Sequence, residues 1–456
     1  MDQAVAVDPR SLLCCPACGG ALSPAADWTC SACALQVPVI DGVPWLTPHA
    51  GDVLAAWRHD LRALLSALRS QAAQYRATLA PGAAAPVRER LGRLASACDD
   101  HAARLGVLMA PLGLGAAGAA PEAYRAVAAP LPPGQSLTGY YANLHRDWCW
   151  GDDENAAARD AVERALGDAN PGRLLVPGCG AGRLAYDLHV RRRPAVTVAA
   201  DLNPLMLGIA RRMYAGESVE LHEFPLAPRD LASQAVLRRL AAPMPAPPGL
   251  WPVLADLAAA PFAAGAWDTV VTHWLVDVLD EDFATFAARV NGWLRPGGRW
   301  VNSGSFFFQH GDPAACPSVD ELPALLRAAG FGQVEIEERE VPYLASPASR
   351  QRRIERVVTF SAVAQRRVAP PPPRSHLPAW LDDPTRPMPV VHGLESHVLA
   401  LRVHAWVASL VDGRRTLEEV AGVLVRERLM PADEALPAVR EFMRRLYAEC
   451  ERGVRP

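Results

Sequence analysis

A glycine-rich segment is the part of this sequence best suited to holding a small ligand. It reads R-L-L-V-P-G-C-G-A-G-R over residues 173–183, with Gly178, Gly180 and Gly182 at alternate positions. The apolar residues before the glycines predict a strand, and those after them predict a helix. Such a turn brings backbone N–H groups close to a ligand and attracts polar or anionic atoms. A tight turn that binds nothing would have the same spacing, so other features must decide.

An acidic residue follows the next predicted strand at a spacing that suits a nucleoside. The apolar run 196–200 ends at Asp201, about twenty residues after the glycines, as in nucleotide-binding sheets. Ligands of open α/β sheets bind beyond the carboxyl ends of the strands, so Asp201 could accept both ribose hydroxyls of a cofactor. Asp201 could instead cap the helix predicted to begin at Pro204, with Asn203 as the rival cap.

Two more features follow the same order of strand and turn. Asp256 and Leu257 come after an apolar run, where a carboxylate can accept the adenine amino group and an apolar side chain can cover the ring. The segment L-R-P-G-G, residues 294–298, lies between the predicted strands 266–273 and 299–303. The glycines, Asp201 and these two features together resemble the S-adenosylmethionine-dependent methyltransferases.

Four cysteines near the N-terminus have the spacing of a metal site. Cys15 and Cys18 form one C-x-x-C pair, and Cys30 and Cys33 form a second. Two such pairs complete a tetrahedral zinc site, and four sulfur ligands leave no open position, so the zinc would be structural. In so short a segment the metal would supply much of the folding free energy. A ribbon that has kept its cysteines and lost the metal is the alternative, and the neighbouring Cys14 fits the spacing less well.

The residues after these cysteines predict a small hairpin. Apolar residues alternate on both sides of Asp41-Gly42, a dipeptide typical of a two-residue hairpin turn. Together with the C-x-x-C pairs, this run resembles the small zinc-ribbon activator subunit that partners tRNA and protein methyltransferases. Here the ribbon would be fused to its catalytic domain.

A closer resemblance extends over about residues 52–365. The segment N-L-H-R-D-W at 143–148, the V-P-G-C-G-A-G-R-L block and the W-V-N-S-G run at 300–304 resemble the carnosine N-methyltransferase family. Members of that family methylate the imidazole ring of a histidine-containing dipeptide. The resemblance implies cofactor contacts by Asn143, Arg146, Gly178, Gly180, Gly182, Asp201, Asp256, Leu257 and His273.

Several of these positions depart from the family pattern. Asn143 stands where the family has glutamine, Asp201 where it has glutamate, and His273 where it has cysteine. Arg146 would meet the carboxylate of the methionine moiety. The alternative for Arg146 is a structural ion pair with the acidic stretch 152–154.

The acceptor residues match the family less well. Asp277 could accept a hydrogen bond from an imidazole N–H, which would leave the other ring nitrogen as the nucleophile. The family's substrate-contacting histidine aligns with Gln309, with His310 one position along. Ile354 stands where a tyrosine is expected, and Tyr343 is nearby but not aligned. These departures leave open whether carnosine itself is the acceptor.

Methyl transfer from a sulfonium is an in-line displacement that depends on proximity and orientation. The enzyme must align the nucleophile, keep it deprotonated and exclude water. Asp277 would orient the acceptor, and His310 or His273 could take a released proton. Either histidine could instead be an ordinary hydrogen-bonded residue of the pocket.

Periodicity and composition place these residues in an α/β protein with a Rossmann-like methyltransferase sheet. Apolar residues recur at helical spacing on both sides of a break at 81–86, which predicts a helical hairpin. The expected domains are a zinc ribbon at 1–50, a helical segment at 51–130, an S-adenosylmethionine-dependent methyltransferase domain at 131–365, a Pro-rich linker at 366–392 and a small helical or winged-helix-like domain at 393–456.

The C-terminal region is the least informative. A capping box at Thr416 and Glu419 opens one of its predicted helices. The pattern of helices resembles a winged helix or the peptide-binding chaperone domains of peptide-modifying pathways. It could hold a peptide or protein partner, or it could be an inert docking domain.

Composition excludes several classes of function. The chain has 456 residues, a net charge of −3, 50% apolar residues and no lysine, so lysine-based Schiff-base and P-loop chemistry are excluded. The charge balance argues against nucleic acid as a partner. No run is long enough to span a membrane and no signal peptide is evident, so a cytoplasmic location is expected.

The leading hypothesis is therefore an S-adenosylmethionine-dependent N-methyltransferase that acts on an imidazole or related amine of a small molecule or peptide. One alternative is a methyltransferase for a protein, a ribosomal peptide or tRNA. A second alternative is a non-catalytic scaffold that has kept the sheet.

Overall fold

The structure, a computed structural model, describes most of the chain in two compact units. The described residues are 7–23, 28–79, 82–114, 129, 131, 135–257, 259, 261–279, 281–308, 316–369, 385, 387–390 and 393–452. One unit comprises residues 1–373 with Pro456, and the other comprises residues 374–455. Gln309, His310 and most of the expected linker lie outside the described residues.

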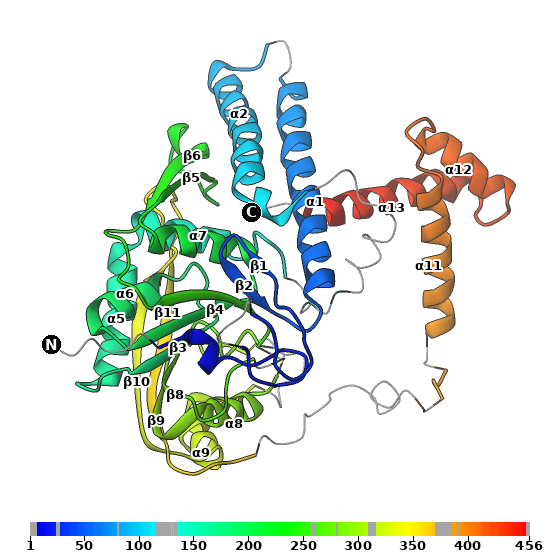
Figure 1. Cartoon of the computed structure of the whole chain (residues 1–456). Helices are drawn as coiled ribbons and strands as arrows, with labels where there is room; N and C mark the ends of the chain where they lie inside the picture. Colours follow the sequence, from blue (N-terminus) through cyan, green and yellow to red (C-terminus); the bar gives the residue numbers. More distant parts are fainter. Residues whose placement is uncertain are drawn as a thin grey trace. The chain divides into compact units, whose positions relative to one another are not determined.

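A single large sheet carries the first unit (Figure 1). Its order is β1-β2-β7-β4-β3-β8-β9-β11-β10. The run from β2 to β9 is parallel, and β11 and β10 are antiparallel. The strands are β1 (Val39–Ile40), β2 (Val43–Leu46), β3 (Arg173–Pro177), β4 (Val196–Asp201), β7 (Leu250–Ala255), β8 (Trp267–His273), β9 (Leu294–Gly304), β10 (Phe331–Tyr343) and β11 (Arg353–Ala364).

The strand order reverses direction at β3. From β3 the chain proceeds outward through β4 to β7, and it then returns to the other side of β3 to form β8. In open α/β sheets this reversal creates a crevice at the carboxyl ends of the strands, where ligands bind. The glycine turn directly follows β3 and therefore lies at this crevice.

Helices cover both faces of the sheet (Figure 1). Leu174 and Val176 of β3 are buried in one apolar cluster with the α6 and α7 side chains, whereas Leu175 is buried with those of α8 and α9 in a second. This alternation is what a strand buried on both faces requires. The helices are α4 (Tyr141–His145), the π-helix η3 (Arg146–Trp150), α5 (Asp152–Leu166), α6 (Arg183–Arg192), α7 (Pro204–Tyr214), α8 (Phe283–Trp293) and α9 (Leu322–Ala328). The Rossmann-like methyltransferase fold predicted from the sequence is confirmed.

The predicted helical hairpin is confirmed as α1 (Ala50–Ala77) and α2 (Ala85–Leu108). Leu61, Leu68 and Leu105 are fully buried between them and the first apolar cluster. A two-stranded sheet of β5 (Ser218–Glu223) and β6 (Val236–Ala241), which the sequence analysis did not anticipate, lies against α2. The short 3₁₀ helices are η1 (Pro9–Leu12), η2 (Ala110–Leu112), η4 (Ala232–Gln234) and η6 (Val319–Glu321).

The N-terminal ribbon adds its last strand to the large sheet. Asp41 and Gly42 have φ angles of 50° and 75°, which is the conformation of the predicted two-residue turn between β1 and β2. Strand β2 then pairs in parallel with β7, with Trp45 opposite Leu254. The ribbon is therefore a structural part of the sheet.

The predicted L-R-P-G-G turn is contained within β9. The register between β8 and β9 shifts between Trp267 and Thr269, where Leu294 and then Arg299 are their partners. Residues 295–297 are exposed and form the bulge.

The second unit consists of helices in its described part. Residues 393–452 form α11 (Leu394–Ser409), α12 (Leu417–Arg426) and α13 (Ala432–Arg452), and they include no strand. The predicted capping box is present, since the Glu419 N–H donates to Thr416 Oγ1 at 3.2 Å and the Thr416 N–H donates to the Glu419 carboxylate at 2.8 Å. Throughout the described residues, no helix is both long and apolar enough to cross a membrane.

Two buried histidines should make the fold sensitive to acid. His101 and His145 are 1% and 0% exposed, and burial lowers the pKa of each to about 3. The folded pKa therefore lies below the unfolded pKa of about 6.5, so stability is present above this value and is lost as the pH falls towards about 3. Each histidine should remove about 2 kcal/mol from the free energy of unfolding between about pH 7 and about pH 5.

Urea unfolding of the wild type and of the His101→Gln/His145→Gln variant at both pH values checks this expectation. The variant should lose less stability on acidification than the wild type. If the free energy of unfolding depended equally on pH in the two proteins, the low pKa of His101 and His145 would be contradicted.

Candidate active site

The three glycines of the turn are required for different structural reasons. All have positive φ angles, of 63°, 55° and 81° for Gly178, Gly180 and Gly182. A Cβ atom on Gly178 would lie 2.5 Å from a methyl carbon of Leu275, and one on Gly182 would lie 2.1 Å from the Tyr214 hydroxyl. A Cβ atom on Gly180 would meet nothing within 4 Å. The space above Gly180 is therefore open to a ligand, whereas the other two glycines permit close internal packing.

Asp201 links the glycine turn to the end of β4. Its carboxylate accepts hydrogen bonds from the Gly180 N–H at 2.8 Å and from the Asn203 N–H at 2.9 Å. Asn203, not Asp201, caps α7, because the Asn203 side chain accepts from the Leu205 N–H at 2.9 Å. Burial raises the pKa of Asp201, and the backbone donors partly offset this effect. Two lone-pair positions remain for a ribose, since a carboxylate offers about four.

Asp256 and Leu257 follow β7 at the same edge of the sheet. Asp201 is paired with Leu254, so the two residues that follow β7 lie close beyond the Asp201 strand end. Arg289 of α8 donates to the Leu257 carbonyl at 2.6 Å and holds this segment from the other side. The structure thus brings these residues and the glycine turn to one crevice.

Arg146 is buried in the π-helix beside the glycine turn. Its guanidinium pairs with Asp147, with Nε–Oδ1 at 2.8 Å and Nη2–Oδ1 at 2.7 Å. The ion pair with the 152–154 stretch, which the sequence left open, is not formed. Glu154 instead accepts from the Leu344 N–H at 3.0 Å and the Ala345 N–H at 2.8 Å. π-helical turns are frequent at functional sites.

Tyr343 lies at the centre of the side chains around Arg146. Its ring centroid is 5.6 Å from the Arg146 guanidinium carbon and 4.4 Å from the Trp274 ring. Burial raises the pKa of Tyr343, and the nearby Asn143 side chain partly offsets this effect. Ile354, which occupies the aligned tyrosine position, is 67% exposed. It lies opposite Pro342, whereas Tyr343 lies opposite Arg353, so the two residues point to opposite faces of the sheet.

Trp274 was not singled out in the sequence analysis. It has a φ angle of 52° directly after β8, a conformation that is rare for a bulky residue and typical of functional sites. A Cβ atom on Gly304 would lie 2.7 Å from the Trp274 backbone nitrogen, so glycine is needed there. The position after a strand at the switch point was the one available signal.

His273 is a weak base in this environment. Its Nδ1 lies 2.7 Å from the Ser303 carbonyl oxygen, so Nδ1 must carry the proton and Nε2 the lone pair. Burial and the positive charge of Arg146 lower the pKa of His273 to about 3. The low pKa keeps His273 neutral, so His273 is better suited to accept a hydrogen bond than to take up a released proton.

Asp277 is buried with only half of its carboxylate engaged. Its Oδ2 accepts from the Ser305 hydroxyl and from the Phe307 N–H at 3.1 Å, whereas Oδ1 is buried and has no hydrogen-bond partner among the described residues. Burial raises the pKa of Asp277. Burial raises the pKa of Tyr140, and the charges of Asp201 and Asp277 raise it further, so this tyrosine, which the sequence analysis missed, lies near both carboxylates.

The four predicted metal ligands converge. The sulfur atoms of Cys15, Cys18, Cys30 and Cys33 all lie within 4.8 Å of one another, with Cys15–Cys33 at 3.6 Å and Cys18–Cys30 at 3.5 Å. A zinc ion bound by four thiolates at 2.3 Å requires sulfur separations of about 3.8 Å. The donor set and its dimensions therefore fit a structural zinc ion.

The residues just before the four-cysteine cluster are also bonded to the segment that follows β7. The Cys14 N–H donates to the Pro261 carbonyl at 2.9 Å, and the Ala263 N–H donates to the Leu12 carbonyl at 3.0 Å. Strand β2 pairs with Leu254 and Ala255, the last residues of β7, just before this segment. The ribbon therefore holds the residues on both sides of Asp256 and Leu257.

Comparison with known proteins agrees with this geometry. Residues 175–301 match the methyltransferase domain family, a stretch that begins in β3 and ends in β9. No curated protein matches the chain.

Solved methyltransferase structures are similar at low identity. Phosphoethanolamine N-methyltransferase 2 of Haemonchus contortus matches at 13% identity and a TM-score of 0.34, over 51% of this chain and 59% of that one. The complex of the Haloferax volcanii Trm112 methyltransferase activator with a methyltransferase matches at 15% and 0.34, over 50% and 97%. The 1,6-didemethyltoxoflavin-N1-methyltransferase of Burkholderia thailandensis matches at 20% and 0.31, over 55% and 93%.

The fold and the matched domain define the class of protein. Residues 175–301 form a methyltransferase domain within a Rossmann-like fold, and the described chain adds a four-cysteine cluster near its N-terminus and helices near its C-terminus.

The turn glycines should respond differently to alanine. In Gly182→Ala the new methyl group meets the Tyr214 hydroxyl, which should lower the free energy of unfolding by about 1–3 kcal/mol beyond the backbone strain. In Gly180→Ala only the strain of about 1–2 kcal/mol applies, but the methyl group enters the open space, so S-adenosylmethionine affinity should fall by about tenfold or more. Calorimetry and thermal unfolding measure both effects. Unchanged cofactor affinity in Gly180→Ala would show that the turn does not contact the cofactor.

Zinc removal should loosen the segment after β7. The Cys30→Ser variant should lose its metal, and amide hydrogen exchange at residues 254–263 should accelerate because the ribbon no longer holds both ends. Cys14→Ser, which changes a thiol outside the cluster, serves as the matched control. Metal analysis of the wild type that finds well below one zinc ion per chain would rule out the site.

Proposed function

We propose that this chain is an S-adenosylmethionine-dependent methyltransferase that transfers the methyl group to a nitrogen of an imidazole or related amine in a small molecule or peptide. The observation that supports this most is the buried Oδ1 of Asp277, to which no described residue donates a hydrogen bond. A buried carboxylate oxygen without a donor is costly, and an N–H group of the acceptor would satisfy it. In an imidazole, that hydrogen bond leaves the second nitrogen with a free lone pair.

The proposed cofactor contacts follow from the crevice. Gly178, Gly180 and Gly182 would approach the cofactor with their backbone, and Asp201 would accept the ribose hydroxyls. Asp256 and Leu257 would contact the adenine, and Asn143 and Arg146 would lie at the methionine end with His273. When bound, S-adenosylmethionine supplies an electrophilic methyl group.

The chain's own contribution is orientation and exclusion of water. Asp277 would fix the acceptor ring, and the aromatic side chains of Trp274, Tyr343 and Tyr140 would border it. His273 would accept a hydrogen bond at Nε2, which its low pKa favours. His310, which lies outside the described residues, stays a candidate for the released proton.

We further propose a structural zinc ion in the four-cysteine cluster and an activator-like role for the ribbon within this chain. Strand β2 in the sheet and the contacts to residues 261–263 support this role. A cytoplasmic location and the domain limits inferred from the sequence stay predictions.

A peptide or protein acceptor is the second candidate. Helix α11 of the C-terminal unit has an exposed apolar group formed by Val398, Leu399 and Leu401, which are 42%, 64% and 53% exposed. Such a group favours a contact with another chain or peptide.

The Asp277→Asn variant tests the acceptor proposal. The amide would present N–H groups in place of an acceptor, so kcat/KM for β-alanyl-histidine should fall by about 100-fold or more, at unchanged S-adenosylmethionine affinity. Asp230→Asn, at an exposed aspartate bonded to Ser233, is the control. Full activity of Asp277→Asn would exclude this residue from the acceptor site.

A further inference from the structure

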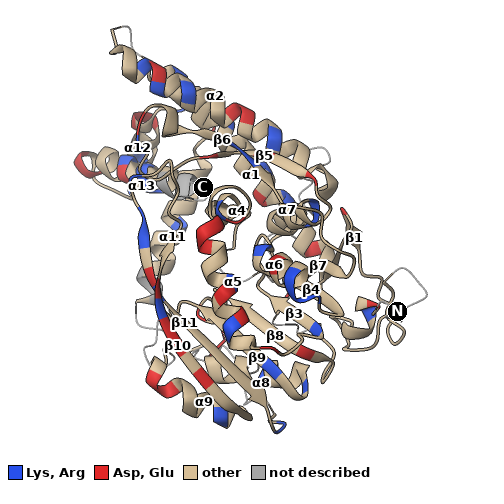
Figure 2. Ribbon diagram, turned by 90° about the vertical axis from the view of Figure 1, so that its left-hand side faces the viewer, with Lys and Arg blue, Asp and Glu red and all other residues tan. Residues whose placement is uncertain are grey.

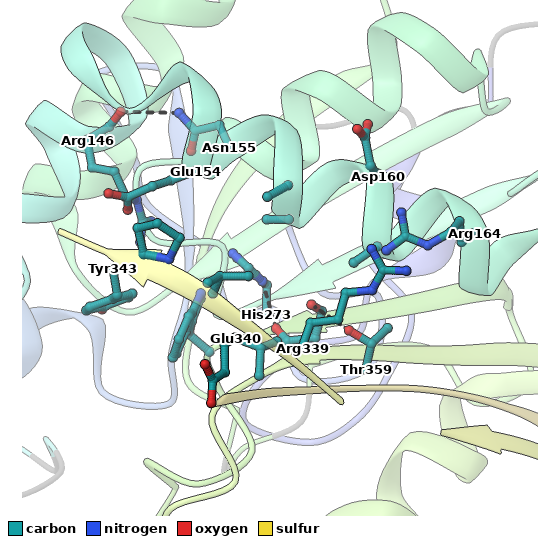
Figure 3. Close-up of a pocket in the computed structure, with 18 residues that line it drawn as sticks. Arg146, Glu154, Asn155, Asp160, Arg164, His273, Arg339, Glu340, Tyr343 and Thr359 are labelled. Atoms are coloured by element: carbon teal, nitrogen blue, oxygen red, sulfur yellow. Dashed lines mark hydrogen bonds between the residues drawn. The ribbon is translucent and has the colours of Figure 1, made fainter. Parts of the chain in front are cut away.

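A cavity of about 310 Å³ extends from the side chains around Tyr343 along one side of α5 (Figure 3). Its inner end is formed by Arg146, His273 and Tyr343, and its outer end by Arg164 and Arg339. The function proposed above uses only the inner end. The volume lies in the range of small-ligand sites, about 300–1,000 Å³.

The cavity is long enough for a dipeptide-sized molecule. Residues 339–343 of the edge strand β10 line it, and the four steps between these five strand residues span about 13 Å. On the opposite side, residues 154–164 of α5 span about 15 Å. The short side chains of Ala157, Ala158 and Ala161 line its middle and leave the space open.

The acidic residues of the cavity wall already have partners. Glu154 accepts two backbone N–H groups, as described above. Asp160 pairs with Arg159 at 2.7 Å, and Glu340 pairs with Arg356 at 3.3 Å. Charges of both signs lie along β10 and β11, so the pairing pattern, not the count of charges, decides the local potential (Figure 2).

The two arginines at the outer end share one carboxylate. Arg164 Nε lies 3.7 Å from Glu337, and Arg339 also contacts Glu337, whose side chain is 40% exposed. One exposed carboxylate does not saturate two guanidinium groups, each of which presents five donors. Guanidinium groups bind carboxylates with paired hydrogen bonds, so the outer end of the cavity favours an anionic ligand group.

We propose that this cavity is a second acceptor subsite, in which Arg164 and Arg339 bind the carboxylate of an amino-acid or dipeptide-sized acceptor. The assignment rests on the proposed function for the reacting end of the acceptor. The carboxylate end is defined independently, by the charges at the outer end of the cavity.

Calorimetry of the full chain loaded with S-adenosylhomocysteine tests the subsite without turnover. The probes are β-alanyl-histidine and glycyl-phenylalanine, each compared with its C-terminal amide. The acids should bind about tenfold or more tightly than the amides, as expected for a charge-assisted pair. The Arg164→Gln/Arg339→Gln variant should lose this preference, and Glu337→Gln, which removes the internal competitor, should increase it. Arg93→Gln, at an arginine of similar exposure on α2, should leave it unchanged.

The outcomes separate the subsite from the acceptor chemistry. Acid preference with both dipeptides but no methylation of β-alanyl-histidine would support the subsite and reject the imidazole acceptor. Acids that bind no better than amides in the wild type, or a preference that survives in the double variant, would overturn the subsite. Glu337→Gln gives an independent answer if the double variant does not fold, because weaker acid binding there would also overturn it.

Discussion

The geometry of the proposed cofactor site depends on the hydrogen bond from the Gly180 N–H to the Asp201 carboxylate. It joins the turn after β3, the strand at which the order reverses, to the end of the neighbouring strand β4. Because Asn203 caps α7, the Asp201 carboxylate is not consumed by the helix. It can therefore hold the turn and still present lone pairs to a ligand.

The same crevice is supported from outside the methyltransferase domain. The ribbon adds β2 beside β7 and bonds to residues 261 and 263, so the four-cysteine ribbon and a sheet edge stabilise one loop together. The π-helix lies on the other side, where the Trp148 indole donates to the Ala181 carbonyl at 2.9 Å and Arg146 is held by Asp147. Elements far apart in sequence thus determine the geometry of a few polar groups.

Short sequence patterns predicted the features that depend on neighbouring residues in the chain. The Asp41-Gly42 turn, the capping box at Thr416, the four cysteines and the strand ends at Asp201 and His273 follow from backbone preference and spacing. Contacts between residues that are far apart in the sequence could not be predicted from these patterns. Tyr343 meets Trp274 and Arg146 only in the folded chain. The sequence also does not show that Ser305 and Phe307 bond to one oxygen of Asp277 and that no described residue donates to the other. Residues 309–315, with His310, lie outside the described part.

Transfer of a labelled methyl group tests the central claim most directly. The full chain, with tritiated S-adenosylmethionine, is offered histidine-containing dipeptides, longer peptides and tRNA in separate reactions. The account predicts label in the dipeptides, with the methyl group on an imidazole nitrogen by NMR. Label confined to the peptides or to tRNA, or no transfer to any acceptor, would contradict it.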